Sequence, residues 1–272
     1  MRSGDLALHH GGLKMKKRNI SINLLIISFF LILPGILFAN NVNNIIQKAN
    51  NMFVGNNIYS VNDMTIYRSG KLNITMKLEN FFMKKGGKSY SLAVYKKPGR
   101  MKGTAYLMIE NDLWIRFSST GRIRKLSSSA KKNSAAGTDF SYNDMGDTGE
   151  GPISRYDMEL VDSKEDVNGE KCYKIICIPK HGEEQDYEKL EVYISTKEYY
   201  YIKIDYFRHK ANIKTLTFSE YRTIGDKIYP YKMVMESHIK PTKTEIITKE
   251  IEFNSSRVKE RYFNISYLER IK

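Results

Sequence analysis

The residues best suited to chemistry in this chain are three carboxylates, Asp139, Asp144 and Asp147, within one glycine-rich segment. Two carboxylates held close together can act as an acid and base pair, and several can bind calcium through their oxygens. The ligands of a calcium-binding loop recur at fixed positions, and these aspartates do not follow that spacing. The spacing therefore favours a solvated acidic turn.

The other reactive side chains are spread along the chain. His181, His209 and His238 show no His-x-x-x-His spacing, and Cys-x-x-Cys is also absent from the sequence. No Gly-x-Ser-x-Gly motif is present. Residues 86–89 (Gly-Gly-Lys-Ser) resemble the end of a phosphate-binding loop, but Phe82 stands where that motif needs glycine. These observations predict a protein that is not an enzyme and has no metal or cofactor.

The two cysteines, Cys172 and Cys177, lie in one predicted strand. Five residues of strand at about 3.3 Å each hold them roughly 16 Å apart on opposite faces. That distance is beyond disulfide reach. We therefore expect two buried thiols.

In most of the chain that must position these groups, apolar and polar residues alternate. In residues 72–79 apolar and polar residues alternate, and residues 190–194 and 229–236 repeat the pattern. A period of two predicts strands, and the Gly, Asn and Asp turns between them predict hairpins. Further strands are predicted at residues 59–67, 90–95, 104–109, 113–117, 156–162, 172–178, 200–207, 213–224 and 244–253. About a dozen strands without helical crossovers make a mainly β, antiparallel meander.

Two segments depart from this alternation. Residues 44–54 place Ile45, Ala49, Met52 and Phe53 on one face, which predicts a helix. Residues 127–152 are rich in Ser, Gly, Lys and Asp, and we expect a long loop with a short helix or turn near residues 140–145. The loop is either a lid over the sheet or an ordinary surface loop.

The N-terminal region has the pattern of an export signal. Basic residues 16–18 precede an apolar run at 24–33, and Ala39 ends a stretch that gives way to asparagines. We predict that residues 1–39 are an N-terminal extension and signal peptide with its start at Met15, and that residues 40–272 form a single β domain outside the cytoplasm. The alternative is an uncleaved anchor. The net charge of +14 either favours anionic partners or is simply a solubilising surface of scattered Lys and Arg, and export argues against nucleic acid.

A long sheet with one apolar face must cover that face with a second sheet, by curling, or with helices. This chain has too few predicted helices to cover it completely. Methionines recur on the predicted apolar faces: Met64, Met76, Met233 and Met235. Flexible thioethers suit a surface that accepts varied apolar ligands, and they also fill ordinary cores.

Several blocks of the sequence resemble the LolA-like outer-membrane lipoprotein-sorting proteins. They are residues 97–107, 112–117, 121–126 and 137–145, followed in similar order by the hairpin at 169–173 and by Tyr229-Pro230. Ser118 stands where the family commonly has proline, and Thr138 where it has serine. The motif loop, whose role the resemblance leaves open, comprises Gly137, Asp139, Phe140, Tyr142 and Asp144.

The resemblance implies an unclosed (half) β-barrel, a curved antiparallel sheet whose apolar concave face is partly covered by helices. It also implies a periplasmic carrier or binder of lipids or lipoproteins that passes them towards the outer membrane. Expected partners are a lipid or acylated lipoprotein and inner- or outer-membrane transport components, and the expected state is a monomer. The alternative is a non-enzymatic cell-envelope binding or scaffold module with a basic surface and no bound lipid. The predicted acyl-chain lining consists of Leu72, Ile74, Met76, Leu78, Trp114, Tyr231, Met233 and Met235.

Overall fold

The computed structural model describes residues 33–53, 55–146, 156–182 and 185–272. The chain divides into two compact units, Met1–Phe38 and Ala39–Lys272, and the second contains the whole sheet. Residues 1–32, which include the predicted start at Met15 and most of the predicted signal, lie outside the described residues. None of the helices that could be examined combines the length and apolar character needed to cross a membrane.

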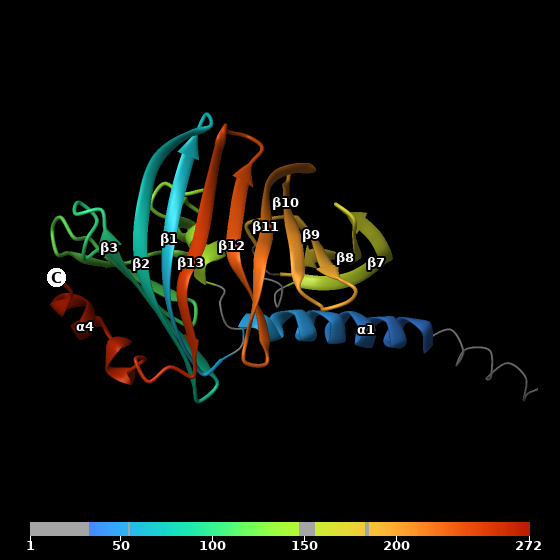
Figure 1. Cartoon of the computed structure of the whole chain (residues 1–272), viewed down its shortest axis with the longest axis horizontal. Helices are drawn as coiled ribbons and strands as arrows, with labels where there is room; N and C mark the ends of the chain where they lie inside the picture. Colours follow the sequence, from blue (N-terminus) through green and yellow to red (C-terminus); the bar gives the residue numbers. More distant parts are fainter. Residues whose placement is uncertain (1–32, 54, 147–155, 183–184) are drawn as a thin grey trace, which may run out of the picture. The chain divides into compact units, whose positions relative to one another are not determined.

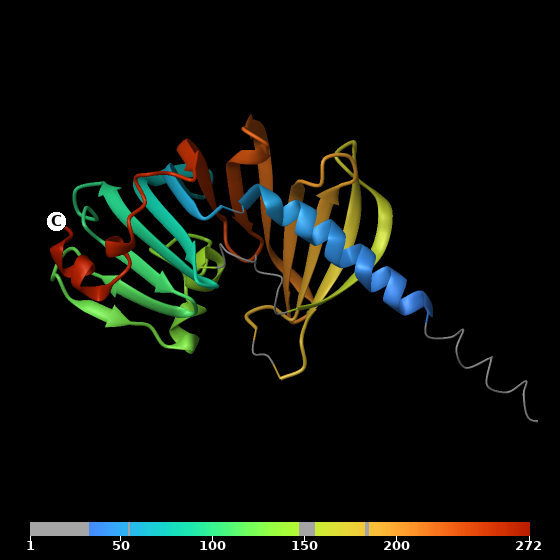
Figure 2. The same ribbon diagram turned by 90° about the horizontal axis from the view of Figure 1, so that it is seen from below.

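One antiparallel sheet of thirteen strands forms the second unit (Figure 1). Its spatial order is β6-β5-β4-β3-β2-β1-β13-β12-β11-β10-β9-β8-β7, so β6 and β7 are the two edges and the sheet does not close. Figure 2 shows its curvature. The expected mainly β, unclosed half-barrel is therefore confirmed. The strands are β1 (Asn57–Arg68), β2 (Lys71–Lys85), β3 (Lys88–Lys97), β4 (Ala105–Ile109), β5 (Asp112–Arg116), β6 (Ile123–Lys125), β7 (Tyr156–Val167), β8 (Glu170–Pro179), β9 (Lys189–Ser195), β10 (Tyr201–Arg208), β11 (Ala211–Ile224), β12 (Lys227–Ser237) and β13 (Thr242–Phe253).

The concave face carries the larger hydrophobic core. Strand alternation brings Met64, Met76 and Ile246 to this face, since Met64 pairs with both of the others. Within the second unit, residues 39–50 of helix α1 (Leu33–Asn50) cover part of the face, and the buried residues Val42, Ile45, Ile46 and Ala49 belong to the same core. The predicted helix at residues 44–54 thus begins earlier, at Leu33, and ends in a 3-10 turn, η1 (Asn51–Phe53).

The convex face carries a second core that covers β1 to β5. Tyr59, Leu92 and Leu107 project to this side and pack against Phe263 and Leu268 from the C-terminal segment. This segment contains η2 (Glu260–Tyr262) and α4 (Ile265–Arg270), which the sequence analysis did not predict. Six helical residues are too few for a 3.6-residue period to be recognised.

The long loop has a described part and a part outside the described residues. Its first part contains α2 (Ser128–Lys131) and α3 (Tyr142–Gly146), and α3 confirms the short helix expected near residues 140–145. Residues 147–155, including Asp147, are outside the described residues. Strand β6 precedes the loop and was missed, because three residues give no visible alternation.

The prediction of two buried thiols is confirmed, since Cys172 and Cys177 are free and fully buried. Burial raises the pKa of Cys177 to about 12. Burial and the nearby Glu170 carboxylate raise the pKa of Cys172 to about 11. Both side chains are therefore thiols, and not the reactive thiolates, at neutral pH.

We expect neither cysteine to react with DTNB in the folded protein at mildly alkaline pH, because both are buried and protonated. Adding a denaturant should release both thiols. Absorbance of the released thiolate gives the stoichiometry and the rate. Rapid labelling without denaturant would show that this part of the sheet opens or that the thiols are accessible.

Candidate functional site

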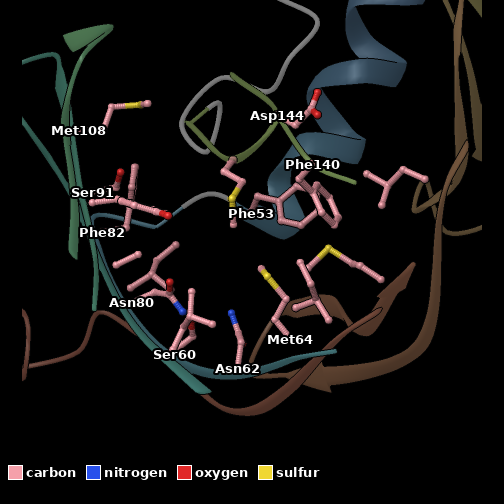
Figure 3. Close-up of a pocket in the computed structure, with 18 of the residues that line it drawn as sticks. Phe53, Ser60, Asn62, Met64, Asn80, Phe82, Ser91, Met108, Phe140 and Asp144 are labelled. Atoms are coloured by element: carbon pink, nitrogen blue, oxygen red, sulfur yellow. The ribbon is translucent and has the colours of Figure 1, made fainter. Parts of the chain in front are cut away.

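An apolar cavity of about 320 Å³ lies on the concave face of the sheet (Figure 3). This volume falls within the range of about 300–1,000 Å³ that is typical of small-molecule sites. Much of the wall consists of inward-facing side chains from β1, β2, β11 and β13: Met64, Leu78, Phe82, Leu216, Phe218 and Ile246. The size and the apolar wall suit a hydrocarbon ligand.

An aromatic cluster closes the cavity where η1 meets the sheet. The ring of Phe53 lies 6.1 Å from that of Tyr201, 6.4 Å from that of Phe218 and 5.9 Å from that of Tyr229, measured between centroids. The hydroxyl of Tyr201 donates a hydrogen bond of 2.6 Å to Asn50 Oδ1 at the end of α1. These contacts fix the end of the helical cover against β10, β11 and β12.

The described part of the long loop covers the cavity beside Phe53, and Phe140, Tyr142, Asp144 and Met145 all line it. Figure 3 shows Phe140 next to Phe53, with Asp144 above them. The ring of Tyr142 lies 5.5 Å from that of Tyr106 on β4. Three of the five motif-loop residues therefore reach the cavity wall.

A buried ion pair holds this loop to the sheet. Lys214 Nζ on β11 lies 2.5 Å from Asp144 Oδ2, and the two side chains are only 10% and 5% exposed. The Tyr187 hydroxyl donates to Asp144 Oδ1 at 3.0 Å, and the Ser141 amide donates to Oδ2 at 2.6 Å. Burial and the charge of Asp144 raise the pKa of Tyr187. The expectation of a solvated acidic turn is thus wrong for Asp144, because a lysine from a distant strand neutralises it.

Asp139 makes a second attachment of the loop, to β13. Its Oδ1 accepts a hydrogen bond from Thr242 Oγ1 at 2.5 Å, and its Oδ2 accepts one from Thr244 Oγ1 at 2.7 Å. Gly137 precedes it with a φ of +76°, a left-handed conformation that favours glycine. Within the described ranges, no group of three or more His, Cys, Asp or Glu side chains is placed to hold a metal. The motif loop is therefore bonded to the sheet and covers the cavity.

The eight residues that we predicted to line the acyl chain lie in different parts of the structure. Leu78 and Met233 line the cavity. Met76 and Met235 are fully buried in the concave core, and Ile74 packs against it. Tyr231 is half-buried outside the cavity wall, where the Arg222 guanidinium lies 4.0 Å from its ring centre.

Trp114 and Leu72 lie elsewhere. Trp114 packs against the convex core, because alternation turns its neighbour Leu113 to the cavity. Leu72 is 63% exposed, and a register shift opposite Tyr67 interrupts the alternation beside it. The predicted lining did not include Leu216 and Phe218, although the alternation of β11 could have shown them. It also did not include four polar residues that line the cavity, because a search for apolar patterns does not select polar side chains: Ser60, Asn62, Asn80 and Ser91.

A curved open sheet around an apolar cavity, covered by a helix and a loop, is the LolA-like class of fold. A family model described as "Uncharacterized protein" matches residues 87–270, which is more than half of the chain, so the chain belongs to the family that this model describes. The search of curated proteins found no significant match.

Solved structures with the same fold include three proteins of low sequence identity. A DUF1329 family protein from Desulfovibrio piger is 24% identical with a TM-score of 0.78, covering 85% of this chain and 99% of its own. A putative outer membrane lipoprotein-sorting protein domain from Vibrio parahaemolyticus is 23% identical with a TM-score of 0.74, covering 84% and 97%. A LolA superfamily protein from Nitrosomonas europaea is 15% identical with a TM-score of 0.67, covering 83% and 98%.

Proposed function

We propose that this protein is a periplasmic, non-enzymatic carrier or binder of lipids or acylated lipoproteins, which it passes towards the outer membrane. The observation that supports this most directly is the apolar cavity on the concave face. The lipoprotein-sorting domain with the same fold supports the class of cargo, and the signal-like N-terminus supports export. Membrane transport components are its proposed donor and acceptor.

The driving force would be burial of acyl chains against the concave face. Each buried methylene contributes roughly 0.8 kcal/mol, so about eight methylenes contribute roughly 6 kcal/mol before the cost of ordering the chain. The covers from α1, η1 and the motif loop would shield the chain from water. Release would follow when a more apolar acceptor takes the chain. A scaffold module without bound lipid would need no such cavity, which favours the carrier.

The test replaces Met233, which lines the cavity, with glutamate. A carboxylate in the apolar wall must be desolvated to bind an acyl chain, so we expect M233E to lose bound lipid. Val234→Glu is the matched control, because alternation places Val234 on the other face of β12, paired with Thr217 and Glu245. The full chain would be exported to a bacterial periplasm, purified without detergent, and examined by native mass spectrometry with lipid extraction.

Acyl species should accompany the wild type and V234E at a fixed stoichiometry and be absent from M233E, with the β-sheet circular dichroism unchanged in all three. A bare polypeptide mass for the wild type, with no uptake of added phospholipid or fluorescent fatty acid, would refute the carrier function. Equal lipid content in M233E would show that the ligand lies elsewhere.

A further inference from the structure

A polar patch interrupts the apolar wall of the cavity. It consists of Ser60 and Asn62 on β1, Asn80 on β2 and Ser91 on β3, and Figure 3 labels all four. The residues lie close together because Ser60 pairs with Asn80, while Ser91 pairs with Phe82, two positions further along β2. Four polar side chains among inward positions that are otherwise apolar need a chemical explanation.

The hydrogen bonds within the polar patch leave one strong acceptor unused. Asn80 Nδ2 donates a long hydrogen bond of 3.5 Å to the buried Ser60 Oγ. The Oδ1 atom of Asn62 is buried and has no hydrogen-bond partner among the residues that the structure describes. A buried acceptor of this kind destabilises a protein unless something donates to it. In Figure 3 both asparagine side chains point into the cavity.

We propose that the polar patch is a subsite for the amide group of an acyl amide, with the acyl chain lying along the apolar wall. The Asn62 amide would turn about its Cβ–Cγ bond so that the buried Oδ1 reaches the cavity and accepts a hydrogen bond from the ligand N–H. The ligand carbonyl would accept one from Asn80 Nδ2. Amides carry both a donor and an acceptor, whereas esters have acceptors only and leave Asn62 Oδ1 unsatisfied. This inference rests on the proposed function and narrows its ligand class.

Two ligands that differ only in this group provide the test: N-methylhexadecanamide and methyl hexadecanoate. Each would displace a fluorescent fatty acid from the full-length protein. We expect the amide to bind about tenfold more tightly than the ester, as for one hydrogen bond to a buried acceptor. In N62L the amide and the ester should bind with affinities within about twofold of each other. The amide loses its hydrogen bond to Asn62 Oδ1, whereas the ester made no such bond.

Asn212→Leu is the matched control. Asn212 on β11 also has a buried Oδ1 without a partner within the described part of the chain, but it is not among the residues that line the cavity. The preference for the amide should survive this change. N80L is a second variant, should N62L fail to fold as judged by circular dichroism. It removes the donor to the ligand carbonyl, which amide and ester share, so both ligands should bind more weakly by a similar factor.

The outcomes separate the two proposals. Equal binding of amide and ester by the wild type would overturn the amide subsite and leave the carrier function standing. An unchanged tenfold preference in folded N62L would also overturn it, as would unchanged binding of both ligands by folded N80L. If neither ligand displaces the probe and the probe itself does not bind, the carrier function falls, and the subsite falls with it.

Discussion

Replacing Asp144 with leucine should lower the free energy of unfolding by about 3–5 kcal/mol, because it leaves a buried ammonium group without its counter-charge. Lys214 is only 10% exposed and lies 2.5 Å from the carboxylate that the change removes. Urea denaturation gives the free energy, and the fluorescence of Trp114, the one tryptophan of the chain, reports the transition. The motif loop should detach from the sheet before the sheet itself unfolds.

A second change distinguishes loss of the charge pair from simple loss of volume. In D144L/K214L no charge is left unpaired, so most of the lost stability should return. The exposed pair between Lys85 and Glu260 is the comparison, since its side chains are 60% and 68% exposed. K85M should cost less than about 1 kcal/mol. A D144L protein as stable as K85M would show that the Lys214 ammonium finds water or another partner.

Replacing Leu268 with alanine should cost about 2–5 kcal/mol, the range for truncating a fully buried leucine. Leu268 has no exposed surface, and it fixes α4 to the convex core. Chemical denaturation measures the loss. Because the change is on the face opposite the cavity, the proposed lipid binding per folded molecule should stay the same.

Ile265 offers a control within the same helix. Its side chain is 43% exposed, so I265A should cost less than about 1 kcal/mol. Both residues are truncated in the same short helix, and only burial differs much between them. Equal losses from L268A and I265A would indicate that α4 contributes through its own helical stability and not through packing.

Much of the sheet could be predicted from alternation, because one face of each strand is buried and the other is not. Residues 72–79 fall inside β2, and residues 229–236 inside β12. The predictions failed where a segment was short or uniformly apolar. In residues 113–115 three apolar residues follow one another, so the sequence could not show that Trp114 faces the convex side.

The candidate site was harder to predict, because distant segments complete it. Asp144 and Lys214 are 70 residues apart in the sequence, and no local pattern links them. Asn62 and Asn80 look like the solvent-facing residues of ordinary strands. Alternation counted from Met64 and Leu78 places them on the concave face, and the register of β1 with β2 brings them together beside the cavity.

The strand order has a consequence for folding. In this sheet, strands that follow one another in the sequence are paired, apart from β6 and β7, which are the two edges. The pairing of β1 with β13 joins strands that are distant in the sequence. The two runs, β1 to β6 and β7 to β13, can therefore form through local hairpins. Joining them requires closure of the segment between β1 and β13, which contains all the other strands of the sheet. Met64 and Leu78 come from the first run, and Leu216 and Phe218 from the second. The cavity is thus assembled only after β13 has been synthesised and paired, so the proposed ligand would bind only after that step.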